Sequence, residues 1–266
     1  MMQQKDKRIP LPDLINKAGS EFLWMGNYWG PCAERTTQPW TCIHLNKFRY
    51  LSRLSHTIYL GTPLKRILEL INIESGKRNI KFYIEFLKKN KKTNNLQFVF
   101  IHQFSPHDPY TVTENCEQQV APVIELDLTN KSQENWEKEY EGYKASYKCV
   151  LKEVLDFMEY ISIADPDAIV VFQGDHGWRS IEDRLKTPED IYHYRASIFN
   201  SIKAPEACFK KFGDPHSNIN TVRFILNCVY GYEFSYLPSI YYRVVASPSS
   251  GHTRSFQEAN TFVFQP

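Results

Sequence analysis

The sequence predicts an α/β fold in which a mostly parallel sheet is flanked by helices. Two short runs, residues 96–104 and 168–173, are almost continuously apolar, which is typical of strands buried on both faces of a parallel sheet. Between them, apolar and aromatic side chains recur every three or four positions from Trp136 to Ile161. That spacing predicts an amphipathic helix of about 25 residues. Strand, helix and strand then form a βαβ unit with parallel strands and a right-handed connection.

Two further elements follow from local signals. The basic run at residues 87–95 predicts the end of a helix that begins near Lys77, because lysines are favoured close to a helix C-terminus. A nucleic-acid-binding patch is the alternative interpretation of that run. The turn at residues 164–167 ends the long helix, and residues 194–205 predict another strand with a trailing loop.

The C-terminal part of the chain contains one clear helical signal. Residues 219–231 predict a helix that Asn220 or Thr221 caps and that the final glycine of the segment ends. Residues 232–266 predict a mostly irregular tail, with one edge strand near residues 241–245.

Composition limits the class of protein. The chain has 266 residues, of which 42% are hydrophobic, and it carries a net charge of +2. We expect a single α/β domain over residues 1–266, and the nearly balanced charge argues against nucleic acid or an anionic membrane as the main partner. No apolar run reaches the roughly 18–20 residues of a membrane span, and the N-terminus lacks the hydrophobic segment of a signal peptide. The chain is compatible with release from a longer precursor.

The six cysteines do not indicate a zinc site, because none of them belongs to a CxxC pair. Cys32 and Cys42 flank a polar loop. They form either a disulfide, in an oxidising compartment, or two free thiols, which is the default expectation.

Polar residues follow the 168–173 strand directly. Asp175 and His176 stand between Gly174 and Gly177, beyond the carboxyl end of the strand, where open α/β sheets bind ligands. The glycines permit backbone angles and close approaches that other residues forbid. The carboxylate and the imidazole suit a divalent ion such as zinc or manganese, whereas an ordinary hydrogen-bonded turn is the alternative.

The other apolar strand ends in a similar way. His102 lies near its end, and His107 follows in a turn that two prolines bracket and stiffen. If the two strands are neighbours, His107 and the Asp175–His176 pair face one crevice. A cationic imidazole and a metal would then frame a tetrahedral phosphoryl or sulfuryl group. The alternative is a rigid loop without a ligand.

Four motifs carry a family resemblance. "FVFIHQFSPHDPY", "DAIVVFQGDHGWR", "YRASIFNSIKAP" and "NTVRFILNCVYG", in that order and with the long helix after the first, resemble the later part of sulfatase-like proteins of the alkaline phosphatase superfamily. The similar proteins are related to bacterial membrane-anchored sulfatases and phosphoethanolamine transferases. The resemblance covers roughly residues 96–245, and residues 18–32 fit more loosely. It implies a metal-dependent hydrolase or transferase that acts on phosphate or sulfate esters.

The resemblance also implies roles for individual residues. Asp175 and His176 match the pair that ligates the divalent metal ion, which would be Zn, Mn or Ca, and His107 matches the histidine that contacts the anionic group of the substrate. Arg179 either touches a phosphate or sulfate oxygen or forms a surface salt bridge. His102 would orient the site, and His252 would be a late metal ligand.

The chain departs from the family pattern at its N-terminus. The family's first strand, with its acidic metal ligand, and its nucleophile belong before the 18–32 segment, and "PCAERTT" does not match the sulfatase signature. Thr36 and Thr37 come too late in the order to replace the nucleophile. We therefore expect the C-terminal portion of the catalytic domain, with weak metal affinity and no turnover unless another chain supplies the missing strand. An exposed sheet edge would also favour dimerisation.

Alternatives from other classes remain open. One is a non-catalytic remnant, or a partner-binding half-domain, of the same fold. Another is a phosphomutase-like or phosphodiesterase member of the superfamily. The resemblance implies an extracytoplasmic location if the chain belongs to a membrane-anchored precursor.

Overall fold

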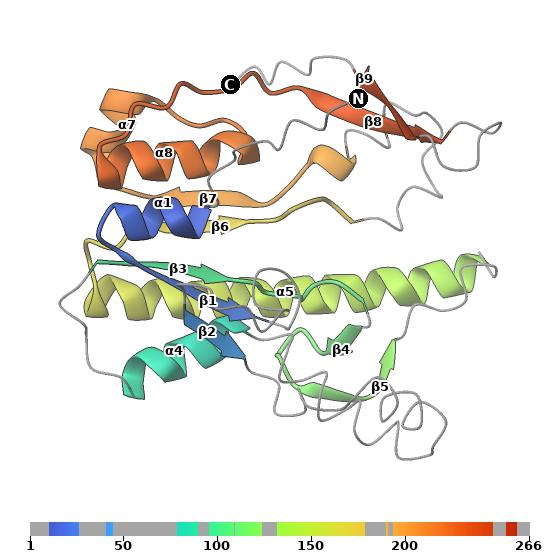
Figure 1. Cartoon of the computed structure of the whole chain (residues 1–266). Helices are drawn as coiled ribbons and strands as arrows, with labels where there is room; N and C mark the ends of the chain where they lie inside the picture. The colour runs from blue at the N-terminus through green and yellow to red at the C-terminus, as the bar shows by residue number, and fades with distance from the viewer. Residues whose placement is uncertain are drawn as a thin grey trace, which may run out of the picture. The chain divides into compact units, whose positions relative to one another are not determined.

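The computed structural model describes residues 11–26, 41–44, 79–89, 96–108, 110–123, 132–178, 190, 194–246 and 254–259. The chain divides into two compact units, Met1–Ala164 and Asp165–Pro266, hereafter the first and the second unit. The sequence led us to expect one domain with an irregular tail at residues 232–266. Figure 1 labels the helices and strands of both units.

A parallel sheet forms the centre of the first unit. It contains β1 (Glu21–Gly26), β2 (Thr41–His44) and β3 (Gln97–Ile101) in the order β2-β1-β3. The central strand β1 is buried along most of its length, and the Trp24 ring stacks on Phe100 of β3 with centroids 4.6 Å apart. Helices with a small parallel sheet confirm the α/β class, although β1 and β2 were not anticipated from the sequence.

The described part of the first unit includes the helices α1 (Leu11–Lys17), α4 (Asn79–Lys89) and α5 (Gln133–Ala164). The predicted helix before the basic run is α4. The predicted long helix is α5, which has 32 residues and is longer than expected. It begins where the Ser132 hydroxyl accepts a hydrogen bond from the Asn135 backbone N–H at 3.3 Å, as a helix N-cap does. Tyr83 of α4 stacks on Phe157 of α5 at 6.0 Å.

A hairpin lies against the other half of α5 (Figure 1). Its strands are β4 (Tyr110–Val112) and β5 (Gln118–Val123), which pair antiparallel. At Gly142 of α5 a side chain would meet the Tyr110 ring at 2.8 Å, so the glycine lets the helix approach β4 closely. A disulfide between Cys116 and Cys149 links the hairpin turn to α5 across 33 residues of sequence.

The described part of the second unit includes paired antiparallel strands and the helices α7 (Glu206–Phe212) and α8 (Asn218–Tyr230). Strand β6 (Val170–Gln173) pairs antiparallel with β7 (Asn200–Lys203), and β8 (Tyr241–Ala246) pairs antiparallel with β9 (Arg254–Ala259). A Cys208–Cys228 disulfide joins α7 to α8. The edge strand expected near residues 241–245 is β8, whereas β9 and α7 were not anticipated.

The ends of α8 were predicted only in part. Gly231 adopts the left-handed conformation with φ 69° and ends the helix as expected. The N-cap is Ser217 rather than Asn220 or Thr221. The Asn220 side chain instead donates to the Leu237 carbonyl and accepts from the Leu237 N–H, both at 2.8 Å.

The expected parallel pairing of the two apolar runs is not found among the described strands. In a shared sheet, β3 and β6 would pair directly or be linked through other paired strands. Instead β3 pairs with β1 in one sheet, and β6 pairs with β7, antiparallel, in another. Within the described residues, the prediction of a parallel sheet therefore holds for the first unit only.

We predict that Phe224→Ala destabilises the second unit strongly. The Phe224 side chain is 0% exposed and packs on the Phe209 ring at 4.9 Å, so the truncation leaves a cavity and costs about 3–5 kcal/mol. Urea unfolding followed by circular dichroism measures the loss. The matched control is Val222→Ala, on the exposed side of the same helix, which changes stability by less than about 0.5 kcal/mol. Equal effects of the two substitutions would contradict the packing described.

Candidate functional site

Asp175 and His176 follow β6 directly and lie at the surface of the second unit. Their side chains are 92% and 49% exposed. The His176 Nδ1 atom is 2.7 Å from the Gly177 carbonyl oxygen, so Nδ1 carries the proton and Nε2 is the ring nitrogen suited to a metal. That Nε2 lies 3.9 Å from the Asp175 Oδ2. Because metal–ligand bonds of this kind are about 2.0–2.2 Å long, one ion can contact both atoms.

The backbone of this loop is held against the segment that leads into β7. Gly174 N–H donates to the Phe199 carbonyl and Gly177 N–H donates to the Arg195 carbonyl, each at 2.9 Å. A side chain on Gly177 would collide with the Tyr194 carbonyl oxygen, whereas one on Gly174 would have only ordinary contacts at 3.7 Å or more. Neither glycine has a left-handed φ. The close approach of the Tyr194 backbone therefore requires a glycine at position 177. The sequence also predicted unusual backbone angles at the two glycines, and neither glycine adopts them.

His107 occupies a tight turn after β3 in the first unit. Its backbone N–H donates to the Phe104 carbonyl at 3.0 Å, and the Ser105–Pro106 peptide within the turn is cis. The Nδ1 atom is 2.8 Å from the Asp108 carbonyl oxygen and 2.9 Å from the Asp108 carboxylate. These oxygens direct the Nδ1 proton toward Asp108. The half-exposed imidazole, which also lies 4.7 Å from the Phe104 ring, is thereby held in one orientation.

His102 lies at the carboxyl end of the parallel sheet. Its backbone N–H donates to the Met25 carbonyl at 2.8 Å, and its ring is tilted against Trp24 at 6.2 Å. A side chain on Gly26 would come within 2.9 Å of the His102 Cβ. Gly26 therefore makes room for this histidine at the edge of the sheet. The role of His102 in orienting a site stays a prediction.

The structure separates the predicted site residues by unit. His102 and His107 belong to the first unit, and Asp175 and His176 belong to the second. The crevice that the sequence predicts for His107 and the Asp175–His176 pair therefore stays a prediction.

Other residues singled out in the sequence lie outside the described residues: Arg179, His252, Thr36, Thr37 and Cys32. Cys42 is disulfide-bonded, which agrees with the disulfide alternative for this cysteine rather than with the default of a free thiol.

A second group of metal-ligating side chains was not predicted. The Sγ atoms of Cys116 and Cys149 and a carboxylate oxygen of Glu153 all lie within 4.8 Å of one another in the first unit. Cys149 is 1% exposed and Glu153 is 4% exposed. The Gln103 side-chain amide donates to Glu153 Oε2 at 3.0 Å and so orients the carboxylate. We call these three residues the sulfur–carboxylate cluster.

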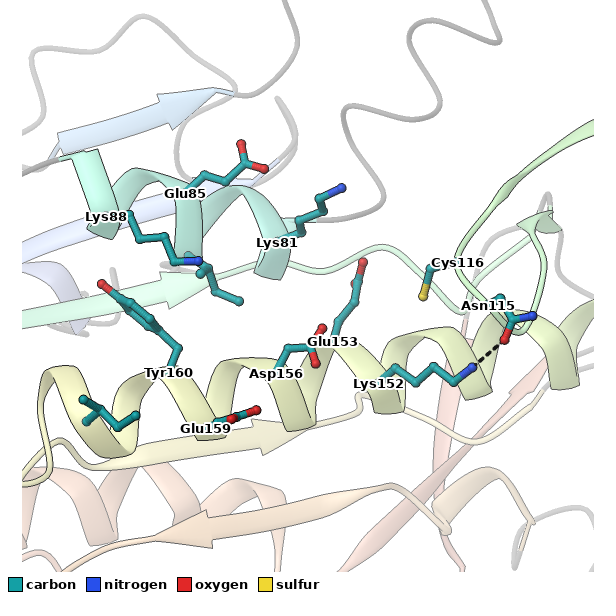
Figure 2. A pocket seen from close by; sticks show the side chains of 12 residues that line it. Lys81, Glu85, Lys88, Asn115, Cys116, Lys152, Glu153, Asp156, Glu159 and Tyr160 are labelled. Carbon is teal, nitrogen blue, oxygen red and sulfur yellow. Dashed lines mark hydrogen bonds between the residues drawn. The ribbon is translucent and has the colours of Figure 1, made fainter.

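The cluster borders a pocket between α4 and α5. The pocket has a volume of about 740 Å³, and Cys116 and Glu153 both line it. Figure 2 shows two lysines that line it, Lys81 on α4 and Lys152 on α5, together with the hydrogen bond from Lys152 to Asn115. The side chains around this opening carry both signs of charge.

One signal in the sequence pointed to part of this cluster. Cys149 and Glu153 are four residues apart, and residues at that spacing share one face of a helix. The apolar stripe predicted for this helix contains Tyr147, Leu151 and Val154 and not these two positions, so the spacing places them on one face without marking the carboxylate as buried. No comparable signal marks Cys116, because the connectivity of disulfides cannot be deduced from sequence alone.

We predict that Gly177→Ala disrupts the Asp175–His176 loop. The new Cβ meets the Tyr194 carbonyl oxygen, and the backbone shift that relieves this collision costs about 1–3 kcal/mol. The matched control Gly174→Ala has no close contact and changes stability by at most about 1 kcal/mol, in either direction. Urea unfolding of both variants checks the difference, and a Gly177→Ala protein as stable as the control would contradict the close approach.

Within the described residues, no helix combines the length and apolar character that a membrane span requires. No known protein family, curated protein or solved structure matches the chain.

Proposed function

We propose that this protein is a sulfatase-like, metal-dependent hydrolase or transferase of phosphate or sulfate esters. In this proposal Asp175 and His176 bind the divalent ion and His107 contacts the anionic group that is transferred. The observation that supports it best is the 3.9 Å separation of His176 Nε2 and Asp175 Oδ2 at the exposed end of β6. The resemblance of the motifs around these residues to the sulfatase-like proteins selects this chemistry from others that a metal can support.

The donor atoms fit a transition metal better than calcium. An imidazole nitrogen beside a carboxylate suits zinc or manganese, whereas calcium is bound by oxygen ligands. The Gly177 carbonyl holds the proton of His176 on Nδ1, which keeps Nε2 as the ligand atom. When bound, the ion would neutralise charge on an ester oxygen and lower the pKa of the attacking hydroxyl group.

The role proposed for His107 follows from its hydrogen bonds. Because Asp108 holds the Nδ1 proton, the imidazole is oriented to donate from Nε2, once protonated, to an oxygen of a phosphoryl or sulfuryl group. In hydrolysis, the bond from phosphorus or sulfur to the alcohol oxygen breaks. A water oxygen takes its place, and the alcohol leaves with a proton. A transferase would use an acceptor alcohol in place of water.

We predict that the protein binds zinc or manganese through Asp175 and His176. The experiment is to dialyse the protein against either ion and to measure the bound metal by mass spectrometry, with hydrolysis of nitrophenyl phosphate and nitrophenyl sulfate followed in parallel. Loss of a residue that only supports a metal ligand typically reduces metal affinity roughly 10–100-fold. Asp175→Ala or His176→Ala removes a ligand itself and should therefore reduce metal affinity by more than that. Any turnover should fall with the bound metal.

Two substitutions control for the removal of exposed polar groups from the same unit. Asp167→Ala removes an exposed carboxylate that precedes β6, and His216→Asn replaces an exposed histidine with a residue that tolerates its positive φ of 49°. Neither should change metal binding. Metal binding by the oxidised protein that survives Asp175→Ala and His176→Ala would refute the assignment. A native protein without metal or turnover would favour the non-catalytic remnant or partner-binding half-domain.

We predict that, wherever the native protein turns over a nitrophenyl ester, His107→Gln lowers kcat/KM without changing the amount of bound metal, because His107 contacts the anion and not the ion. Loss of one such interaction in a transition state costs on the order of 100-fold. Steady-state kinetics with a nitrophenyl ester, combined with metal analysis, separates the two effects. An unchanged kcat/KM, or a parallel loss of metal, would contradict the role given to His107.

A further inference from the structure

We propose that Cys116, Cys149 and Glu153 form a redox-gated zinc site in the first unit, which binds the ion when the Cys116–Cys149 disulfide is reduced. This inference is independent of the proposed function. The three ligand atoms lie within 4.8 Å of one another. Zinc binds thiolate sulfur at about 2.3 Å and carboxylate oxygen at about 2.0–2.2 Å. Small rotations of the three side chains therefore bring each of them to one ion, with a water as the fourth ligand.

The helix supplies two of the ligands without a change in its backbone. Cys149 and Glu153 are one turn apart on the buried face of α5. Gln103 donates a hydrogen bond to Glu153 and accepts one from the Ile80 N–H at 3.2 Å. This chain of bonds fixes the carboxylate, as the outer hydrogen bonds of metal ligands do.

The hairpin turn that carries Cys116 is built without help from the disulfide. The Cys116 N–H donates to the Thr113 carbonyl and the Thr113 N–H donates to the Glu117 carbonyl, each at 2.9 Å. The Thr113 hydroxyl also accepts hydrogen bonds from the backbone N–H groups of Asn115 and Glu117. This turn therefore presents Cys116 in the same way after reduction.

Two side-chain bridges hold the turn against α5. Lys148 Nζ lies 2.7 Å from the Glu114 carboxylate. Lys152 Nζ donates to Asn115 Oδ1 at 2.8 Å, a bond that Figure 2 shows. These bridges, together with the Tyr110 ring against Gly142, keep the sulfur of Cys116 opposite α5 when the covalent link is broken.

The buried carboxylate distinguishes this cluster from a purely structural disulfide. A disulfide is neutral and needs no acid beside it. Burying a carboxylate is costly unless it is hydrogen-bonded or binds an ion. Glu153, 4% exposed directly beside the two sulfur atoms, accepts a hydrogen bond from Gln103 and would gain the ion as a further partner. A zinc ion would complement the charge of this carboxylate and of the two thiolates that reduction produces.

Reduction would begin at Cys116. Cys116 lines the pocket, whereas Cys149 is 1% exposed. A thiolate of a dithiol reductant attacks Cys116 Sγ, the disulfide breaks, and Cys149 leaves as a thiolate. The second thiol of the reductant then closes its own disulfide and releases Cys116. The reductant thus loses two electrons to the cysteines, and zinc binding displaces the protons that remain on the two thiols.

The test uses the full chain carrying Asp175→Ala and His176→Ala, so that the metal pair of the proposed function cannot contribute. The protein is reduced with dithiothreitol, desalted without oxygen and titrated with Co²⁺, whose sulfur-to-metal absorption reports thiolate ligands. Zinc affinity follows from displacement of the cobalt. We expect a thiolate–cobalt band in the reduced protein and none in the oxidised protein.

Matched variants assign the band to the cluster. Cys149→Ser should abolish it, whereas Cys228→Ser, which breaks the disulfide between α7 and α8, should leave it. Glu153→Gln should weaken zinc binding at least roughly tenfold, whereas Glu159→Gln, on the same helix and in the same pocket wall, should not.

Four outcomes would overturn the proposal: no thiolate band after reduction, a band that persists in Cys149→Ser, equal affinity in Glu153→Gln, or unfolding of the protein on reduction as judged by circular dichroism. If Cys149→Ser itself fails to fold, the comparison of Glu153→Gln with Glu159→Gln decides, because both variants keep every cysteine. Failure of this proposal leaves the Asp175–His176 assignment untouched, since that pair is absent from the protein tested.

Discussion

The buried face of α5 is the constraint on which the rest of the first unit depends. Its residues change in size along the helix: Gly142 and Ser146 are small, and Phe157 is large. The small end admits the Tyr110 ring of the hairpin, and the large end stacks on Tyr83 of α4. One helix thus receives an antiparallel hairpin on one half and a second helix on the other. Glu153, the buried acidic residue, lies on this face between the small residues that receive the hairpin and Phe157, which packs on α4.

Elements whose signal is local could be predicted from the sequence, and their pairing could not. The periodicity of α5, the apolar runs of β3 and β6 and the terminal glycine of α8 each depend on neighbouring residues, and all four elements are present. Strand partners depend on distant segments. The βαβ rule assumes that both strands share one sheet, but β6 pairs antiparallel with β7, which follows it in the chain. Predicting that β1 is the central strand would also have required knowing its pairing with β3, which lies more than seventy residues away in the sequence.

The same division applies to the candidate sites. The position of Asp175 and His176 just beyond a strand was predicted because strand and loop are contiguous, and Gly177 proved necessary for the close approach of the neighbouring backbone. The sulfur–carboxylate cluster was missed because it needs the β4–β5 hairpin to fold back onto α5, and 33 residues separate its two cysteines. The spacing of Cys149 and Glu153 along one helix could be seen in the sequence, whereas the contact between the hairpin turn and α5 could not be predicted from it.

Two asparagines of α8 fix the position of the segment that follows the helix. Asn220 and Asn227 each exchange a donor and an acceptor bond with the backbone of one residue, Leu237 and Phe234 respectively. Seven helical residues rise about 10.5 Å, and three extended residues span about 10 Å, so the two lengths agree when the segment runs back along the helix. The segment is thereby aligned with the helix although it forms no β-ladder. Inserting one residue between 234 and 237 would leave one of the two asparagine side chains without its backbone partner.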